Sequence, residues 1–394
     1  MGRLSVGWLR GRVMVMATVI LALLAAGTWF ALSYAQAKQA GRSAAGGHRE
    51  HASQTSASAQ PLHVTSVTPA RRARDVNGTA PVRVQFSAPL AAGSPLPTIS
   101  PAIPGSWQRL AAATIEFVPK KGFAPRAHVT VRVPAGASGV TSASGGVLAK
   151  AVVVRFRVGA WSTIRLDQLL AQLGYLPLTW TPEAGAANPV PGDASGQLAA
   201  AFSPPAGIFS WQHGYPSELR TFWQQGKPGL VLTGAVMAFE SDHDLTMDGV
   251  AGPVVWRALF RAVETGQDDA HGYTYARASE NSPETLTIWH DGHVVLRTLA
   301  NTGIPAAPTT VGTAPVYLRY RFQIMKGTNP DGSKYADPVS FVSYFRAGEA
   351  VHYFPRGSYG FPQSLGCVEL PYGAAEQAWP YLTFGSLVTV APPS

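Results

Sequence analysis

Apolar and polar side chains alternate with a period of two between Leu62 and Val158. The alternating apolar positions are Val82, Val84 and Phe86, then Val129, Val131 and Val133, then Val154, Phe156 and Val158. Gly- and Pro-rich segments separate these runs, which predicts strands that bury one face. We therefore expect residues 61–158 to form a small antiparallel β-sandwich. No catalytic grouping stands out in it, so we interpret it as a spacer.

The spacing of apolar residues becomes helical after Trp161. The first helical set is Leu166, Leu169, Leu170 and Leu173, at i, i+3, i+4 and i+7. A second helix is predicted near Thr233 and a third from Pro253, because proline is favoured in a first helical turn. We expect a three-helix module over residues 161–265. A Pro-, Gly- and aromatic-rich insertion from Pro177 to Leu230 interrupts it.

Strand-like alternation returns from Thr285, and Asp291-Gly292 predicts a tight hairpin turn. The alternation of Val388, Thr389 and Val390 predicts a closing strand. We place a third, mainly β domain at residues 280–394. The whole chain is thus predicted to be multidomain and mainly β, with one small α module.

The N-terminal segment predicts export. Residues 13–34 are apolar and about long enough to cross a bilayer, and three arginines precede them. Ala35-Gln36-Ala37 resembles a signal-peptidase site. We favour an uncleaved membrane anchor over a cleaved signal segment for residues 1–34; either places the remaining chain on the cell-wall or periplasmic side. Residues 35–60 have almost no large apolar side chains, which predicts a flexible linker.

The formal net charge is +9, from 31 Lys and Arg against 22 Asp and Glu. Such a surplus favours an anionic partner. The Lys and Arg residues are not concentrated in one run, and the chain is expected outside the cytoplasm. We therefore expect an anionic wall polymer or a lipid surface, and no nucleic acid. No phosphate loop, dinucleotide motif or cluster of metal-ligand residues is visible, so we expect no cofactor and no metal.

Cys367 is the only cysteine of the chain. Cysteines in an oxidising compartment are usually paired, so a single one is either a small buried hydrophobe or a reactive thiol. His352 lies fifteen residues upstream and has the pKa of a general base near neutral pH. Gly366 gives the backbone freedom beside the sulfur, where the amides of Gly366 and Cys367 are candidate oxyanion donors. We predict that Cys367 is a nucleophile and His352 its base.

His352 is followed by the run Ser364-Leu365-Gly366-Cys367-Val368-Glu369-Leu370. This order resembles the L,D-transpeptidase catalytic domain (YkuD-like), whose signature is a histidine and then Ser/Thr-His-Gly-Cys-apolar-Arg-apolar. Further similar stretches are Asn301-Thr302-Gly303, Pro308-Thr309-Thr310-Val311-Gly312 and the ending Phe384-Gly385-Ser386-Leu387-Val388-Thr389-Val390. The resemblance implies that Cys367 accepts the acyl group and His352 is its base. It also implies that Ser364 holds the active-site loop and that Gly366 and Cys367 supply backbone donors.

The two preceding domains also resemble parts of cell-wall proteins. Residues 99–107 are similar to bacterial immunoglobulin-like domains found beside wall enzymes. Residues 234–243 and 247–256 resemble a peptidoglycan-binding three-helix module, in which the Asp-Gly-x-x-Gly turn is structural. Binding to the peptidoglycan glycan is therefore expected of residues 161–265.

Three positions depart from the catalytic signature. Leu365 stands where the family often has histidine, and Tyr353 replaces the small residue that commonly follows the base. Glu369 stands where the family usually has arginine, and a carboxylate cannot attract substrate carboxylates. Arg356 is a candidate replacement for that charge. These departures concern the choice of substrate, because they leave the nucleophile and the base in place.

The resemblance implies acyl transfer between two peptidoglycan stem peptides, a donor and an acceptor, through a thioester. An L,D-carboxypeptidase would use the same Cys/His pair, with water in place of the acceptor amine. A non-catalytic wall-binding protein is a third interpretation, suggested by the two accessory domains and by Glu369. A cysteine endopeptidase of the wall is disfavoured, because such enzymes usually place Cys before His.

Overall fold

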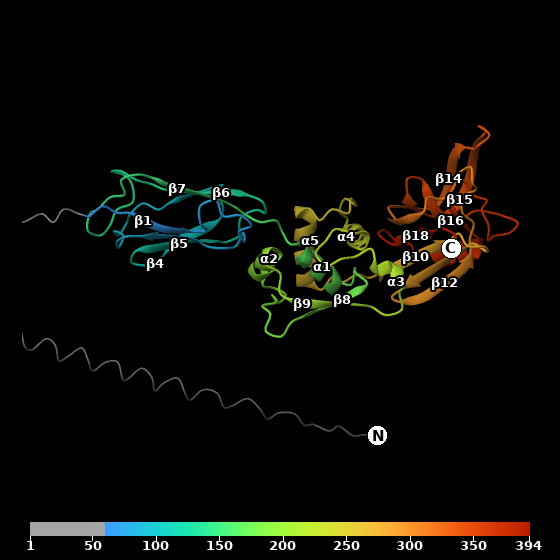
Figure 1. The fold of residues 1–394 in the computed structure, drawn as a ribbon, viewed down its shortest axis with the longest axis horizontal. Helices are drawn as coiled ribbons and strands as arrows, with labels where there is room; N and C mark the ends of the chain where they lie inside the picture. The colour runs from blue at the N-terminus through green and yellow to red at the C-terminus, as the bar shows by residue number, and fades with distance from the viewer. Residues whose placement is uncertain (1–59) are drawn as a thin grey trace, which may run out of the picture. The chain divides into compact units, whose positions relative to one another are not determined.

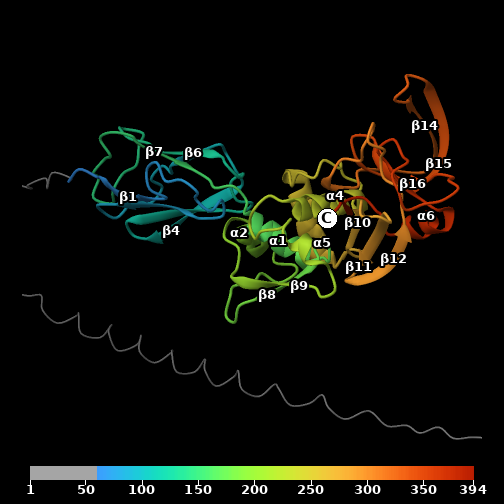
Figure 2. The same cartoon turned by 45° about the vertical axis from the view of Figure 1, so that its right-hand side comes forward.

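The computed structural model describes residues 60–394, which form a β-rich, then a helical, then a second β-rich region along the chain (Figures 1 and 2). The expected anchor at residues 1–34, and the expected linker up to residue 59, lie outside the described residues. Among residues 60–394, no helix combines the length and the apolar character that a membrane span requires.

The first β region is a sandwich of two antiparallel sheets. Its four-stranded sheet has the order β1-β2-β5-β4, with bounds Val64–Thr68, Val82–Phe86, Thr114–Pro119 and Gly105–Ala111. Its three-stranded sheet has the order β3-β6-β7, with bounds Thr98–Ser100, His128–Val133 and Val152–Arg157. The predicted alternation is confirmed: Val82, Val84 and Phe86 are buried, whereas Arg83 and Gln85 between them are exposed.

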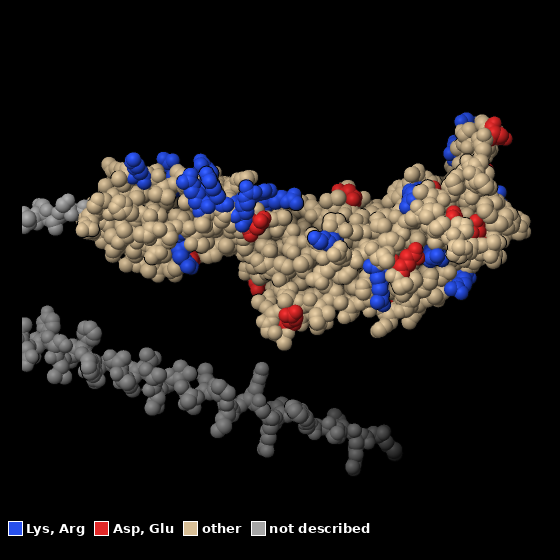
Figure 3. All heavy atoms as spheres, viewed as in Figure 1, with Lys and Arg blue, Asp and Glu red and all other residues tan. Residues whose placement is uncertain are grey.

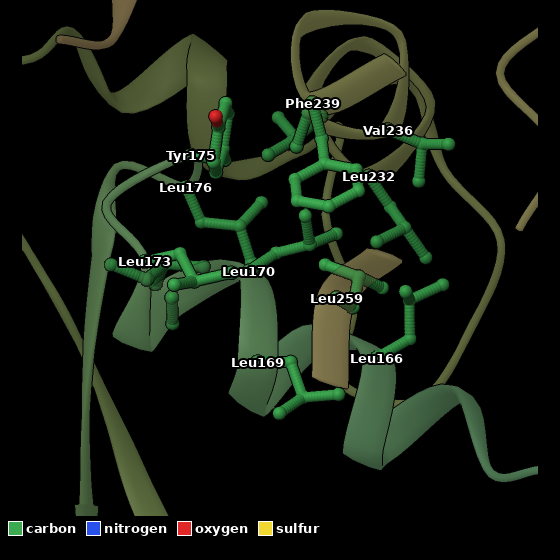
Figure 4. Packing of buried hydrophobic residues seen from close by; sticks show 14 of the residues in the cluster. Leu166, Leu169, Leu170, Leu173, Tyr175, Leu176, Leu232, Val236, Phe239 and Leu259 are labelled. Atoms are coloured by element: carbon green, nitrogen blue, oxygen red, sulfur yellow. The ribbon is translucent and has the colours of Figure 1, made fainter. Parts of the chain in front are cut away.

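The helical region contains the three predicted helices, α1 (Thr163–Gln172), α4 (Leu230–Asp242) and α5 (Pro253–Thr265). The insertion between α1 and α4 folds into a two-stranded sheet and two short helices. These elements are β8 (Leu178–Pro182), α2 (Ala194–Phe202), β9 (Gly207–Trp211) and α3 (Ser217–Arg220). The leucines of α1 face side chains from α4 and α5, including Leu232, Phe239 and Leu259 (Figure 4). The helical spacing in the sequence therefore identified the core of this region.

The second β region packs two sheets against each other. The five-stranded sheet has the order β12-β11-β10-β18-β13, with bounds His293–Leu299, Thr285–His290, Thr274–Ser279, Leu387–Ala391 and Gly312–Pro315. The four-stranded sheet has the order β14-β15-β16-β17, with bounds Leu318–Thr328, Lys334–Arg346, Glu349–Tyr353 and Val368–Leu370. Helix α6 (Tyr372–Ala378) follows β17. Apolar side chains from both sheets and from α6 form one buried cluster.

The five-stranded sheet includes residues before position 280, where the sequence predicted the third domain to begin. Strand β10 lies at the centre of the five-stranded sheet, ahead of residue 280. Both of its faces are buried: Tyr275 packs with the helical region, while Ala276 and Ala278 pack between the sheets. A strand covered on both sides does not alternate between apolar and polar residues, so its period gave no signal. The Asp291-Gly292 turn between β11 and β12 was correctly predicted, and both residues have positive φ.

Candidate active site

The candidate nucleophile and base come from two neighbouring parallel strands. His352 lies in β16, and Cys367 directly precedes β17. The strands pair with His352 opposite Glu369, one residue beyond the pair Val351 and Val368. Paired residues share a face of a sheet, so His352 and Glu369 face the same side. Cys367, His352 and Glu369 all line one cavity, where the pairing of β16 and β17 brings them together.

The orientation of His352 is fixed by its own strand. Its Nδ1 lies 2.9 Å from the carbonyl oxygen of Tyr353. A carbonyl only accepts hydrogen bonds, so Nδ1 carries the proton and Nε2 keeps a free lone pair. Burial of the ring lowers the pKa of His352 below its ordinary value, against smaller opposing effects from the Tyr353 carbonyl and Glu369. The neutral imidazole is therefore the resting form at neutral pH, as a general base requires.

The thiol of Cys367 is protonated in the resting site. Burial raises its pKa to about 12; a hydrogen bond from the Ala350 backbone works in the opposite direction, and the carboxylates of Glu369 and Glu349 oppose the thiolate further. The Sγ atom makes a weak contact of 3.9 Å with the carbonyl oxygen of Gly348. A neutral thiol and a neutral imidazole that line the same cavity are not a preformed ion pair. The proton must therefore leave sulfur as the sulfur attacks.

Ser364 bridges the loop that presents the sulfur. Its buried hydroxyl donates to the carbonyl oxygen of Cys367 at 2.6 Å and accepts from the amide of Gly366 at 3.1 Å. This corrects one expectation: the Gly366 amide is occupied within the loop and is not a free oxyanion donor. Gly366 instead has a φ of +108°, which a residue with a side chain adopts only under strain.

Buried polar residues that sequence reasoning did not single out as site residues support this loop from behind. Thr302 accepts the amide of Ser364 on its carbonyl oxygen at 2.9 Å. Both its own amide and its hydroxyl donate to the buried carboxylate of Glu284, at 2.6 and 2.8 Å. Asn301 pairs through its backbone with Glu369 and accepts the Gly360 amide on its side chain at 3.0 Å. The similarity of Asn301-Thr302-Gly303 to the family was the available signal, but it did not indicate this supporting role.

Arg356 and Glu369 form a two-point ion pair in the cavity wall. Arg356 Nε lies 2.8 Å from Glu369 Oε2, and Nη2 lies 2.7 Å from Oε1. Nη2 also donates to the carbonyl oxygen of Gln363 at 2.9 Å, and the guanidinium lies over the ring of Phe354, 4.6 Å from its centroid. Hydrogen bonding to Glu369 raises the pKa of Arg356. The carboxylate at the unusual position is thus neutralised by the arginine that the sequence suggested as a replacement.

The cavity has a volume of about 570 Å³, within the usual range for sites that hold small ligands. The long hairpin β14–β15 supplies one wall through Gln323, Ile324, Met325, Lys326, Tyr335, Asp337, Val339 and Tyr344. Leu365, more than a third exposed, also lines it, so an apolar side chain faces the cavity where the family often has histidine. Tyr353 does not line the cavity; its ring packs on Tyr372 with centroids 5.1 Å apart.

No group of three or more His, Cys, Asp and Glu side chains within residues 60–394 is arranged to hold a metal ion. What these residues do assemble is a thiol, a neutral base and a loop that holds the sulfur. This is the equipment of a cysteine acyl transferase or hydrolase.

Comparison with known families identifies two of the three regions. Residues 275–390 match the family model of the L,D-transpeptidase catalytic domain (YkuD), and residues 58–158 match that of a bacterial Ig-like domain (Big_5). The chain therefore contains an L,D-transpeptidase catalytic domain, the domain of an enzyme, preceded by an Ig-like sandwich. The peptidoglycan-binding resemblance of the helical region stays a prediction. No curated protein matches the sequence.

Several solved L,D-transpeptidases resemble the structure. One from Mycobacterium smegmatis is 16% identical with a TM-score of 0.28, and the match covers 84% of this chain and 100% of that one. L,D-transpeptidase 3 from Mycobacterium tuberculosis is 16% identical with a TM-score of 0.28, over 83% and 98% of the two chains. The catalytic domain of the E. faecium enzyme is 26% identical with a TM-score of 0.28, over 30% and 96%. At these TM-scores the assignment rests on the family match.

Proposed function

We propose that the protein is a cysteine-dependent L,D-transpeptidase that cross-links peptidoglycan stem peptides through a thioester acyl-enzyme. The observation that carries this proposal is the shared cavity of Cys367 and His352 in the region that matches the catalytic family. The family acts on peptidoglycan stem peptides outside the cytoplasm. Membrane attachment through residues 1–34 and glycan binding by residues 161–265 are further parts of the proposal.

The first half-reaction forms the thioester. Cys367 Sγ attacks the peptide carbonyl that follows the L-centre of the donor stem, while His352 Nε2 takes the thiol proton. The amide of Cys367 is the backbone donor that we assign to the developing oxyanion, because the Gly366 amide is bound to Ser364. Collapse of the intermediate breaks the C–N bond, and His352 returns the proton to the departing amine of the terminal D-residue.

The second half-reaction transfers the acyl group. An amine of the acceptor stem attacks the thioester carbonyl and passes its proton to His352. The C–S bond breaks, and the sulfur recovers its proton from the imidazolium. Water in place of the amine would give the L,D-carboxypeptidase reaction with the same residues, so the product distinguishes the two.

In this proposal the substrate is not attracted by a free arginine beside the nucleophile, because Arg356 is paired with Glu369. The Arg356–Glu369 pair leaves little net charge next to Cys367, and Leu365 adds apolar surface. The remaining charges on the cavity wall, Lys326 and Asp337, lie on opposite strands of the β14–β15 hairpin. We expect the donor stem to be held mainly by shape and by hydrogen bonds to strand edges.

The test is product analysis by mass spectrometry, with a purified donor tetrapeptide stem and an excess of acceptor stem. We expect a cross-linked dimer and release of the terminal D-residue, with neither product from Cys367→Ala or His352→Ala. Hydrolysed tripeptide without dimer would replace transpeptidation by the carboxypeptidase reaction.

Ertapenem separates the enzyme from a non-catalytic binding protein. The catalytic domain of the E. faecium L,D-transpeptidase has been seen acylated by this compound. We expect a covalent adduct on Cys367 in the wild type. A wild type that forms no adduct and no product from stems would favour the wall-binding interpretation.

A further inference from the structure

The positive charge of this protein is concentrated in the Ig-like sandwich. Residues 60–158 contain twelve Lys and Arg against two Asp and Glu, whereas residues 159–394 contain 13 against 19. The part of the chain that carries the catalytic site is therefore acidic overall, and the described part that precedes it is strongly basic. A charge of this size in one domain of about one hundred residues calls for an explanation other than solubility.

The outer face of the β3-β6-β7 sheet holds a set of exposed arginines. Arg132 of β6 and Arg155 and Arg157 of β7 point outward, because the alternate residues Val131, Val133, Val154 and Phe156 are buried. The pairing places His128 opposite Arg157 and Thr130 opposite Arg155. No acidic side chain belongs to this face.

Residues 71–75, which lie beside β7, add further positive charge to this side of the sandwich. The backbone of this segment runs along the free edge of the strand: the Arg72 amide donates to the Arg155 carbonyl at 2.7 Å, and the Arg157 amide donates to the Ala73 carbonyl at 2.9 Å. Arg71 and Arg74 belong to this segment and are exposed, and Asp75 is its one acid. In Figure 3, Lys and Arg side chains gather on the side of the sandwich where Figure 1 shows β6 and β7.

None of these arginines is neutralised by another described residue. Arg71, Arg72, Arg74, Arg132, Arg155 and Arg157 make no ion pair and no side-chain hydrogen bond within residues 60–394. In the other sheet of the same sandwich, two arginines do have partners. There Arg83 contacts the carboxylate of Glu116 at 2.6 Å, and Arg109 donates to the carbonyl of Leu90 at 2.9 Å.

We propose that this arginine face, defined as Arg71, Arg72, Arg74, Arg132, Arg155 and Arg157, binds a linear polyanion of phosphodiester groups. The guanidinium fork matches two phosphate oxygens at once, and arginine outnumbers lysine nine to three in residues 60–158. Residues two apart in a strand, such as Arg155 and Arg157, are separated by about 7 Å on one face, which presents successive contacts along an extended chain. The sandwich thus holds the enzyme on an anionic polymer while the catalytic site acts on stem peptides.

The composition of the face favours a polymer over a bilayer surface. Proteins that lie on bilayers insert aromatic or large aliphatic side chains beside their basic residues. The outward positions here are His128, Thr130, Thr98 and Ser100 beside the arginines, and Val153 is the one aliphatic residue among them. A surface without such anchors gains its binding energy from charge, which predicts strong salt dependence.

The test measures binding of the full chain to fluorescently labelled poly(glycerol phosphate) by polarisation at 50 and 200 mM NaCl. We expect binding at 50 mM that weakens by at least about tenfold at 200 mM. Arg155→Glu/Arg157→Glu should weaken binding at 50 mM by more than about tenfold. The matched control is Arg257→Glu/Arg261→Glu on α5, which makes the same charge change at two exposed residues and should alter binding by less than about threefold.

Three results would overturn the proposal: no binding of the wild type at 50 mM, equal losses in the two double variants, or binding to phosphatidylglycerol vesicles without binding to the polymer. The N-terminal 59 residues are the same in all these proteins, so they do not affect the comparison. The milder variant Arg155→Gln/Arg157→Gln should give an intermediate loss with an unchanged melting temperature. Ertapenem acylation of both double variants should match the wild type, which separates this test from that of the catalytic proposal.

Discussion

Arginine is used in opposite ways in the catalytic cavity and on the Ig-like sandwich. Arg356 contacts the buried carboxylate of Glu369 through two nitrogens and stacks on Phe354. Arg155 and Arg157 are exposed and have no partner among the described residues. The first arrangement cancels charge where the chemistry occurs, and the second projects charge into solvent. The net charge of +9 therefore describes the sandwich and the N-terminal residues, not the active site.

The largest effect is expected at the sulfur. Cys367→Ala removes the only group that can form a thioester, so ertapenem adduct formation, followed by intact-protein mass spectrometry, should fall below detection. Binding to poly(glycerol phosphate) should remain within about twofold of the wild type, because the arginine face is unchanged. A joint loss of both properties would show that the two regions do not act separately.

The next largest effect is a difference in the free energy of unfolding between a variant of the paired Arg356 and a variant of the unpaired Arg155. Arg356→Gln leaves the buried Glu369 carboxylate without its cation, so we expect the free energy of unfolding to fall by about 3 kcal/mol. Arg155→Gln removes an exposed, unpaired charge and should change it by less than about 0.5 kcal/mol. Urea denaturation measures both. Adding Glu369→Gln to Arg356→Gln should recover part of the loss, and equal effects of the two single arginine variants would contradict the comparison.

A smaller effect is expected from Ser364→Ala. The change leaves the Gly366 amide and the Cys367 carbonyl without the hydroxyl that joins them, at a cost of about 1–3 kcal/mol per buried group. Poorer positioning of the sulfur should slow ertapenem acylation by about tenfold or more. Ser364→Thr keeps the hydroxyl and should retain most of the rate. An unchanged rate in Ser364→Ala would mean that the loop is held by other contacts.

The smallest effect is the pH dependence of acylation. The reaction starts from a protonated thiol and needs neutral His352 to accept its proton; burial lowers the pKa of His352 while it raises the pKa of Cys367 to about 12. As pH falls through the lowered pKa of His352 the base becomes protonated, so the rate should drop about tenfold per pH unit only on the acid side of about 6.5. From about pH 7 to 10 the rate should be flat. A tenfold rise per unit through about pH 8.5 would indicate an ordinary free thiol instead.

Sequence periodicity predicted the elements that bury one side. The strands around Val84 and Val131 and helix α1 follow from it, whereas the hairpin at Asp291-Gly292 was predicted from its turn residues. Strand β10 did not, because both of its faces are covered. The hairpin β14–β15 was also not foreseen. Its cavity-lining residues have mixed polarity, and their position over the sulfur depends on tertiary packing.

The candidate site could be predicted in chemistry but not in detail. The uniqueness of Cys367, the placement of His352 upstream and the glycine before the sulfur were visible in the sequence. The sequence suggested Arg356 as a replacement for the missing arginine but did not indicate that it pairs with Glu369. Twelve residues lie between the two, and their meeting depends on the parallel pairing of β16 and β17. The assignment of the Gly366 amide was wrong, because the hydrogen bond from Ser364 is set by the path of the loop and not by residue type.

The hydrogen bond between His352 Nδ1 and the carbonyl of Tyr353 has a consequence for inhibition. Many catalytic histidines take their tautomer from a side chain, which one mutation can remove. Here the partner is a main-chain atom of the same strand, which every amino acid at position 353 would supply. A resistant variant could not disable the base by replacing that partner, since no codon change deletes a carbonyl. An inhibitor whose reaction needs the neutral imidazole of His352 in this tautomer and orientation should therefore remain effective against variants at position 353.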